Sequence, residues 1–323
     1  MPLEPVVLFF VLGLAAGLAR ADLKLPTALY DTLSIYLLLA IGLKGGVELA
    51  RHPLIDVLPQ AAAAVAVALI IPLAAFAVLR RLGHFSRADA ASIAAHYGSV
   101  SVVTFAVGTS YLTRLGVPYE GYMVAFLALL EFPALLLGVV LARRSAAEAR
   151  NGQGALGNRE LLREVFLGKS IFLLGGGLLI GAYAGADGIK SISPLFVDPF
   201  KGVLALFLLE MGLVAAGRLG DLRRVGVFLL SFALITPLVA GVLGAVTGRA
   251  IGLSIGGTTL LAILYASASY IAAPAAMRTA VPEANPALSI GASLGVTFPF
   301  NLLVGIPIYY WLAVSLHKLG GAS

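Results

Sequence analysis

Apolar runs close to twenty residues long recur along the whole chain and are separated by short polar segments. A helix needs about 20 such residues to cross the hydrocarbon core of a bilayer, whereas a β-barrel shows short alternating segments. The pattern predicts an all-α polytopic membrane protein embedded in the lipid bilayer. Ten spans are expected, at residues 5–20, 27–50, 55–79, 90–113, 119–142, 166–185, 198–217, 224–248, 256–278 and 287–314.

Composition agrees with this pattern and excludes several classes of protein. Of the 323 residues, 60% are hydrophobic and 12% are charged, against about a quarter charged in soluble domains. There is no cysteine, which excludes disulfides and thiolate metal sites. No P-loop or HExxH motif occurs, and the four histidines are widely scattered, so we expect the chain to be neither an enzyme nor an ATP-driven transporter on its own.

The basic residues predict orientation rather than nucleic-acid binding, because they lie between spans. Loops on one side carry fifteen Lys and Arg residues, and those on the other carry six. The richer side is expected to be cytoplasmic, which places both termini outside the cytoplasm of a bacterial inner membrane. The longest polar segment, 143–165, is a predicted cytoplasmic linker between a first five-helix unit, 1–142, and a second, 166–323.

The two units contain similar motifs in the same order, about 170 positions apart. The pairs are IGLKGG (41–46) with MGLVAA (211–216), YGSVSVV (97–103) with YASASYI (265–271), GVPYE (116–120) with AVPEA (280–284), and EFPALLLG (131–138) with TFPFNLLVG (297–305). Because each unit has an odd number of spans, the second copy must be inverted. Inverted repeats with interrupted helices at corresponding positions indicate a secondary transporter and its binding site.

Spans 4 and 9 are the predicted interrupted helices. Their hydroxyls and helix breakers are Gly98, Ser99, Ser101, Thr104, Ser267, Ser269, Tyr270 and Pro274. The first half of span 9 is expected to end at Ser269 or Tyr270, and the second to begin near Ala272, with Pro274 in its first turn. Two helix N-termini that meet at mid-membrane would attract a small anion. The alternative is that these hydroxyls only bond to helix carbonyls or ease packing.

Intramembrane charges are costly and are usually functional. Glu131 lies in span 5, and its counterpart in the second unit is Thr297, which Asn301 follows closely. These side chains would lie beside the crossing, where a carboxylate could balance a coupling cation or carry a proton. Lys44 and Glu48 are four positions apart in span 2 and could simply pair.

Segments including GSVSVVT, EFPAL and YASASYIAAPAAMRTAVPEANPALSIGAS resemble the SbtA-type sodium-dependent bicarbonate transporters over most of the chain. The resemblance implies core and gate domains, a homotrimer, and Na⁺-driven bicarbonate uptake. It also implies a PII-like cytoplasmic regulator, for which the 143–164 loop is the expected docking surface. The substrate-site positions that it implies are Ser99, Ser101, Thr104, Ser267 and Ser269.

The chain departs from that family at one place. Where the family pattern reads Ser-Asp-Ile-Ser-Gly-Pro, this sequence reads SYIAAP, with Tyr270 and Ala272 at the aspartate and second serine positions. Hard cations need oxygen ligands, and those left are Glu131, the nearby hydroxyls and freed carbonyls. Two alternatives therefore stay open: a carrier of another small anion, coupled to H⁺ through Glu131, and a membrane sensor that binds a ligand without translocating it.

Overall fold

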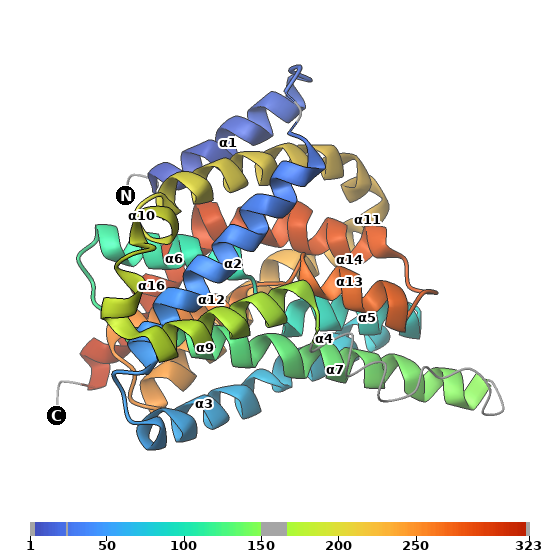
Figure 1. Ribbon diagram of the computed structural model, residues 1–323. Coiled ribbons are helices and arrows are strands. Elements are labelled where there is room, and N and C mark those ends of the chain that lie inside the picture. Colours follow the sequence, from blue (N-terminus) through green and yellow to red (C-terminus); the bar gives the residue numbers. More distant parts are fainter. Residues whose placement is uncertain (1–3, 24, 150–166, 321–323) are drawn as a thin grey trace.

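The computed structural model describes residues 4–23, 25–149 and 167–320, and every regular element in these ranges is a helix (Figure 1). The elements are α1 Pro5–Leu18, α2 Thr27–Leu49, α3 Leu54–Ala68, α4 Ile70–Arg81, α5 Arg87–Gly98, α6 Val102–Arg114, α7 Met123–Ala149, α9 Lys169–Ile189, α10 Ser193–Phe196, α11 Phe200–Ala250, α12 Ile255–Ala266, α13 Ala272–Ala280, α14 Pro286–Ala292, η1 Ser293–Thr297, α15 Phe298–Phe300, η2 Asn301–Gly305 and α16 Ile306–Gly320.

Eight segments of the described chain are long and apolar enough to cross a membrane. They are Thr27–Leu49, Leu54–Arg81, Arg87–Arg114, Met123–Ala142, Lys169–Ile189, Ser193–Arg218, Gly226–Ala250 and Pro286–Leu319. The two other predicted spans, 5–20 and 256–278, correspond to shorter apolar helices, Pro5–Leu18 and Ile255–Ala266. The prediction of an all-helical, multi-pass membrane protein is therefore confirmed.

The predicted linker begins later than expected. Helix α7 runs on to Ala149, seven residues into the segment 143–165, and the rest of the linker lies outside the described residues. The sequence RRSAAEA accounts for the extension, because alanine, arginine and glutamate are strong helix formers.

One group of helices packs through very close backbone contacts. We call it the first helix group: α1, α2, α9 and residues 200–225 of α11, which bends at Gly226 (φ 75°). Helix α1 lies along α11 in Figure 1, and α2 lies along α9. Gly13 meets the backbone at Leu209, and Gly46 meets the backbone at Leu178, so a side chain at either glycine would clash. Such small residues let membrane helices approach closely.

The second helix group comprises α3 to α7, the rest of α11, and α12 to α16. In the Arg87–Arg114 span, 94% of the apolar window is buried, and α12 is buried from Gly256 to Ala266. Helices buried on every side belong to the interior of a bundle rather than to its lipid-facing surface. The first predicted interrupted helix and the first half of the second are therefore enclosed by other helices, whereas α13 is partly exposed.

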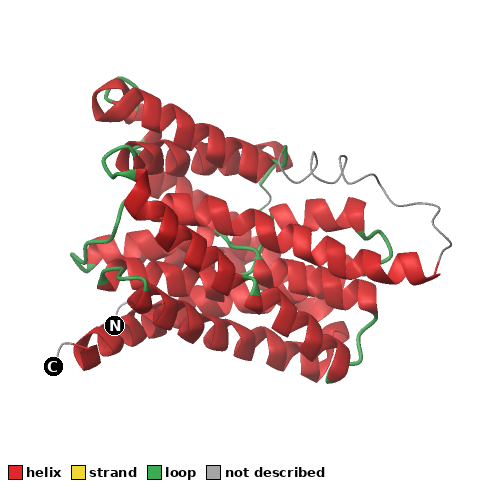
Figure 2. Cartoon of the chain, turned by 90° about the horizontal axis from the view of Figure 1, so that it is seen from below, coloured by secondary structure: helices red, strands yellow, loops and turns green. Residues whose placement is uncertain are grey.

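The ends of the chain share one end of the bundle. In Figures 1 and 2 both labelled termini lie on the left, whereas the C-terminal part of α7 projects to the right. Helices α5 and α6 follow one another across the bundle, and α12 and α13 do the same.

Candidate functional site at the crossing of two broken helices

The first helix interruption separates α5 from α6. Helix α5 ends at Gly98, Ser99 and Ser101 are extended, and α6 begins at Val102. The Ser101 Oγ caps the new helix, since it accepts hydrogen bonds from the Thr104 N–H at 3.2 Å and from the Thr104 hydroxyl at 2.9 Å. This is the serine N-cap that satisfies a free amide of a first helical turn.

The second interruption separates α12 from α13. Helix α13 begins at Ala272, but α12 already ends at Ala266, so the end expected at Ser269 or Tyr270 is wrong by at least three residues. At this end of α12, side chains donate hydrogen bonds to the last carbonyls of the helix. The Ser267 hydroxyl donates to the Leu264 carbonyl at 2.8 Å, and the Asn301 amide donates to the Ala266 carbonyl at 2.8 Å.

Pro274 lies in the first turn of α13, where its missing N–H costs nothing. The Ser269 Oγ accepts the N–H of Ala273 at 3.2 Å. Ser269 and Ser101 lie 168 positions apart, and each hydroxyl caps the second half-helix at its own interruption.

The two interruptions are hydrogen-bonded to each other. The Ser101 N–H donates to the Ser267 Oγ at 2.9 Å, and the Ser269 N–H donates to the His96 carbonyl at 2.8 Å. All four residues are at least 96% buried. Figure 2 shows these loop segments in green within the bundle, surrounded by helices. The crossing is therefore a fixed junction of two chain segments distant in sequence.

The hydroxyls at the crossing fall into two classes, according to whether or not they donate a hydrogen bond to a described residue. Ser99 donates to the Glu131 carbonyl at 3.2 Å, Ser267 donates to Leu264, and Thr104 donates to Ser101. Ser101 and Ser269, by contrast, only accept hydrogen bonds from the described residues. A hydroxyl can donate one proton while it accepts. Ser101 and Ser269 therefore keep a donor for a ligand.

Backbone donors are also free at this place. The amides of Val102 and Val103 begin α6 and cannot bond within the helix, and no described residue accepts from them. Helix N-termini of this kind bind anions through their N–H groups and their partial positive charge. The crossing therefore contains two serine hydroxyls and two backbone amides that donate to no described residue.

Two further oxygen atoms near the crossing are buried without a hydrogen-bond partner among the described residues: Oε2 of Glu131 and the hydroxyl of Tyr270. The Glu131 side chain is 2% exposed, and its backbone carbonyl accepts the bond from Ser99. The Tyr270 ring packs against Phe298 at a centroid distance of 4.8 Å. Buried polar groups are normally paired, so both oxygens are available to a ligand.

Thr297 and Asn301 are already engaged with protein groups. The Thr297 hydroxyl donates to the Ala233 carbonyl at 2.7 Å and lies 2.7 Å from the Tyr97 hydroxyl. The Tyr309 hydroxyl donates to Asn301 Oδ1 at 2.8 Å. The sequence reasoning missed both tyrosines; a tyrosine two residues before Ser99, repeated before Ser267, was the available signal for Tyr97.

The same segment contains two short π-helices, η1 and η2, on either side of Phe298–Phe300. Pro299 lacks the N–H that an α-helix needs there, which accounts for the change of register. Single-turn π-helices occur frequently at functional sites.

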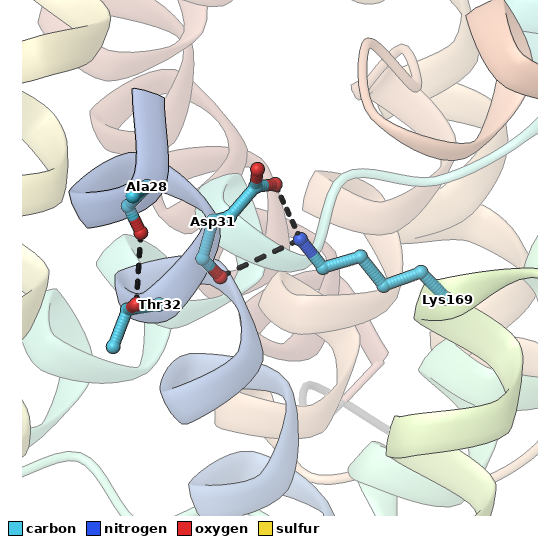
Figure 3. A network of polar contacts seen from close by, with 4 residues as sticks. All are labelled: Ala28, Asp31, Thr32 and Lys169. Atoms are coloured by element: carbon cyan, nitrogen blue, oxygen red, sulfur yellow. Dashed lines mark hydrogen bonds and ion pairs between the residues drawn. The ribbon is translucent and has the colours of Figure 1, made fainter. Parts of the chain in front are cut away.

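A cavity of about 470 Å³ leads to the second interruption, and we call it the α9–α13 cavity. Tyr270, Ile271 and Ala272 line its inner part, and Asp31 and Lys169 lie in its wall. Figure 3 shows the Lys169 ammonium group reaching from α9 to α2, where it binds Asp31 Oδ1 at 2.7 Å and the Asp31 carbonyl at 3.4 Å. The cavity therefore reaches the start of α13, next to the crossing, along the boundary between the two helix groups.

Within the described residues, no group of three or more His, Asp or Glu side chains could hold a metal ion. Enclosed broken helices with unpaired donors, reached by a cavity, define a multi-pass membrane protein of the transporter class. A comparison with curated proteins gave no match. Residues 5–314 match the family model of the Na⁺-dependent bicarbonate transporter superfamily, and the chain belongs to this family.

Proposed function

We propose that the protein imports bicarbonate together with Na⁺ by alternating access, with the anion bound where the two interrupted helices cross. The observation that carries the proposal is the set of unpaired donors there. The hydroxyls of Ser101 and Ser269 and the amides of Val102 and Val103 can surround one small oxyanion. Gly98, Ser99, Thr104 and Ser267 then frame the site and keep these donors in position.

Cation binding in this proposal uses the oxygens that lack partners. The Glu131 carboxylate provides a negative charge, and the Tyr270 phenol can add a neutral oxygen. Sodium is a hard cation that such ligands suit. Thr297 and Asn301 contribute through position, since the Asn301 amide ties α12 to η2.

The arrangement of ten spans as two inverted five-helix repeats is supported by the way in which the first two helices of each repeat pack on those of the other repeat. Helix α1 packs on α11 and α2 packs on α9, which is the reciprocal pairing expected if the first two helices of each repeat correspond. The two tyrosines of the repeated YxSxS motif behave alike. Tyr265 donates to the Ala64 carbonyl, and Tyr97 reaches the Ala233 carbonyl through Thr297. Ala64 and Ala233 lie 169 positions apart in the sequence.

Alternating access is supported by cavities on either side of the α6 and α13 half-helices. The α9–α13 cavity reaches Tyr270. A second cavity, of about 250 Å³, lies between α2 and α6 and is lined by Phe105 and Thr109 of α6. We call it the α2–α6 cavity. Both follow the boundary between the two helix groups, so relative movement of a gate (the first group) and a core (the second) would open one and close the other.

The charge bias of the loops and the family resemblance support the remaining proposals. These are a bacterial inner-membrane location with both termini outside the cytoplasm, a homotrimer, and a PII-like cytoplasmic regulator. Most of the 143–164 docking loop lies outside the described residues.

The second candidate function is H⁺-coupled carriage of another small anion. It is favoured by one observation: Tyr270 and Ala272 stand where the family pattern has an aspartate and a serine, so Glu131 is the carboxylate that remains at the crossing. A lone buried carboxyl is suited to carrying a proton.

Uptake of labelled bicarbonate into proteoliposomes tests the proposal. We expect uptake with an inward Na⁺ gradient and little without it. Uptake that follows a proton gradient instead would favour the second candidate, and no bicarbonate uptake under either gradient would refute bicarbonate as the substrate. The double change Ser101→Ala with Ser269→Ala should abolish most uptake, whereas Ser315→Ala, which removes a half-buried hydroxyl of α16 bonded to the Trp311 carbonyl, should not. Unchanged kinetics in the double variant would show that the site assignment is wrong.

A further inference from the structure

The α2–α6 cavity contains charges that the proposed transport site does not use. Its walls come from α2, α6, the α6–α7 connection and the start of α11, so both helix groups line it. The positively charged residues in its lining are Lys44 and Lys201. The cavity lies toward the end of the bundle that the loop charges assign to the outside of the cell.

Lys44 has an unusual position for a lysine. It lies inside the apolar span Thr27–Leu49, and no described carboxylate forms an ion pair with it. The pairing with Glu48 considered from the sequence is absent, because Glu48 instead binds Arg51, Oε1 to Nη1 at 2.7 Å. A charge within a membrane span is costly, and it is kept where it meets a cavity or a ligand.

Lys201 lies in the first turn of α11 and is likewise without an ion pair among the described residues. Of the carboxylates that line the cavity, Glu48 is taken by Arg51, and exposed Asp198 is the other. The lining contains two lysines and two carboxylates, and because Arg51, outside the lining, pairs with Glu48, Asp198 is the one lining carboxylate left to balance both lysines. This leaves an excess of positive charge in a cavity with phenylalanine walls. Low-dielectric walls strengthen the field of such charges.

The hydroxyls in the lining have already donated their protons. Thr109 donates to the Ala106 carbonyl at 2.8 Å, Thr113 donates to Thr109 at 2.8 Å, and Ser110 donates to Glu4 at 2.8 Å. Tyr119 interacts with both threonines, and burial raises the pKa of its hydroxyl, so it stays neutral. The two ammonium groups are thus the cationic donors offered to a ligand.

The α9–α13 cavity does not have the excess of positive charge found in the α2–α6 cavity. In the repeat alignment, Val214 and Asp31 stand at the positions of Lys44 and Lys201. In the α9–α13 cavity the ammonium group of Lys169 is neutralised by Asp31, as Figure 3 shows. The unpaired lysines therefore break the symmetry of the repeats, on one side only.

We propose that the α2–α6 cavity is a second anion site, in which Lys44 and Lys201 collect a small monovalent oxyanion of the bicarbonate class before it reaches the crossing. The outward placement of this site and its ligand rest on the proposed function. Its volume of about 250 Å³ equals roughly eight water volumes, so it takes an anion with part of its hydration shell. Such a site concentrates dilute anion and leaves tight binding to the crossing.

The test is the dependence of uptake on external bicarbonate and on salt. Lys44→Met keeps the length of the side chain and removes its charge, and we expect it to raise KM about three- to tenfold, well above its effect on the maximal rate. Raising the ionic strength should increase the KM of the unmodified protein and have little effect on that of the variant. Lys44→Arg should restore KM. The matched control is Lys318→Met, which removes an exposed charge at the same end of the bundle outside the cavity.

A KM that is equal in Lys44→Met and Lys318→Met would overturn the proposal, as would a rise in KM that Lys44→Arg fails to rescue. If the unmodified protein transports no bicarbonate, the proposed function fails first, and binding is then measured directly. The detergent-solubilised protein should broaden the NMR line of labelled bicarbonate, and Lys44→Met combined with Lys201→Met should reduce that broadening. An unchanged line width in the double variant would refute the site.

Discussion

Ser267→Ala tests whether the junction of the two interrupted helices determines the stability of the protein. The Ser267 hydroxyl links three segments: it donates to the Leu264 carbonyl at 2.8 Å and accepts the Ser101 N–H at 2.9 Å. Ser267 is 1% exposed and has extended backbone angles (φ −81°, ψ 163°), which alanine also adopts. The substitution therefore removes the hydrogen bonds without backbone strain.

The decrease in the free energy of unfolding depends on which buried groups Ser267→Ala leaves without a hydrogen-bond partner. The Leu264 carbonyl keeps a hydrogen bond from the Ser267 N–H at 3.3 Å, so its loss is small. The Ser101 N–H, in contrast, is left buried without an acceptor, which costs about 1–3 kcal/mol. The expected decrease in the free energy of unfolding is therefore about 2 kcal/mol, and the melting temperature should fall by roughly 2 °C for each kcal/mol in a chain of this size.

Thermal unfolding of the detergent-solubilised protein measures this decrease, with Ser34→Ala as the matched control. Ser34 is 2% exposed, and its hydroxyl has no hydrogen-bond partner among the described residues, so its loss should change the melting temperature little. Uptake should fall in Ser267→Ala and persist in Ser34→Ala. Equal melting temperatures in the two variants would refute the reasoning that the serine holds the crossing together.

Three other substitutions have defined outcomes. Glu131→Gln should abolish the dependence of bicarbonate uptake on Na⁺ while the protein still folds, because the carboxylate has no hydrogen-bond partner at Oε2; a retained Na⁺ dependence in proteoliposomes would contradict this. Tyr309→Phe should lower unfolding stability by about 1 kcal/mol, measured by thermal unfolding, since it removes the bond to Asn301 Oδ1. Gly46→Ala should lower stability more than Gly176→Ala, because its Cβ would meet the α9 backbone whereas that of Gly176 meets open space; equal melting temperatures would exclude close packing there.

Much of the fold could be predicted from the sequence because a bilayer imposes long apolar helices. The pattern identified eight described segments of spanning length and the position of both interruptions, including the start of α13 at Ala272. The lengths of α1 and α12 were not predictable in the same way. Burial inside the protein replaces contact with lipid along α12, whereas α1 leaves Leu8, Leu12 and Leu18 exposed, and the structure gives no such reason for its short length.

The sequence predicted which segments form the candidate site, but not the end of α12 or the hydrogen-bond partners of the serines. The repeated serines marked the right segments, yet α12 ends three residues early because Asn301, distant in sequence, satisfies the Ala266 carbonyl. No local pattern gives such a partner. The sequence also could not predict which hydroxyls donate a hydrogen bond within the protein. Ser99 and Ser267 donate one, whereas Ser101 and Ser269 only accept.

In the proposed transport site, the different uses of these donors would allow a site without arginine both to bind an anion and to release it. The hydroxyls of Ser99 and Ser267 donate within the protein, to the carbonyls of Glu131 and Leu264, and are not available to a ligand. Ligand binding is left to neutral donors, the amides of Val102 and Val103 and the two capping serines. Neutral donors bind an anion less strongly than an ion pair would, because a charge-assisted bond is roughly twice as strong. A transport cycle needs weak anion binding at the crossing, because the anion must be released there. Positively charged side chains are more useful where the anion is first collected, which is the α2–α6 cavity with its unpaired lysines.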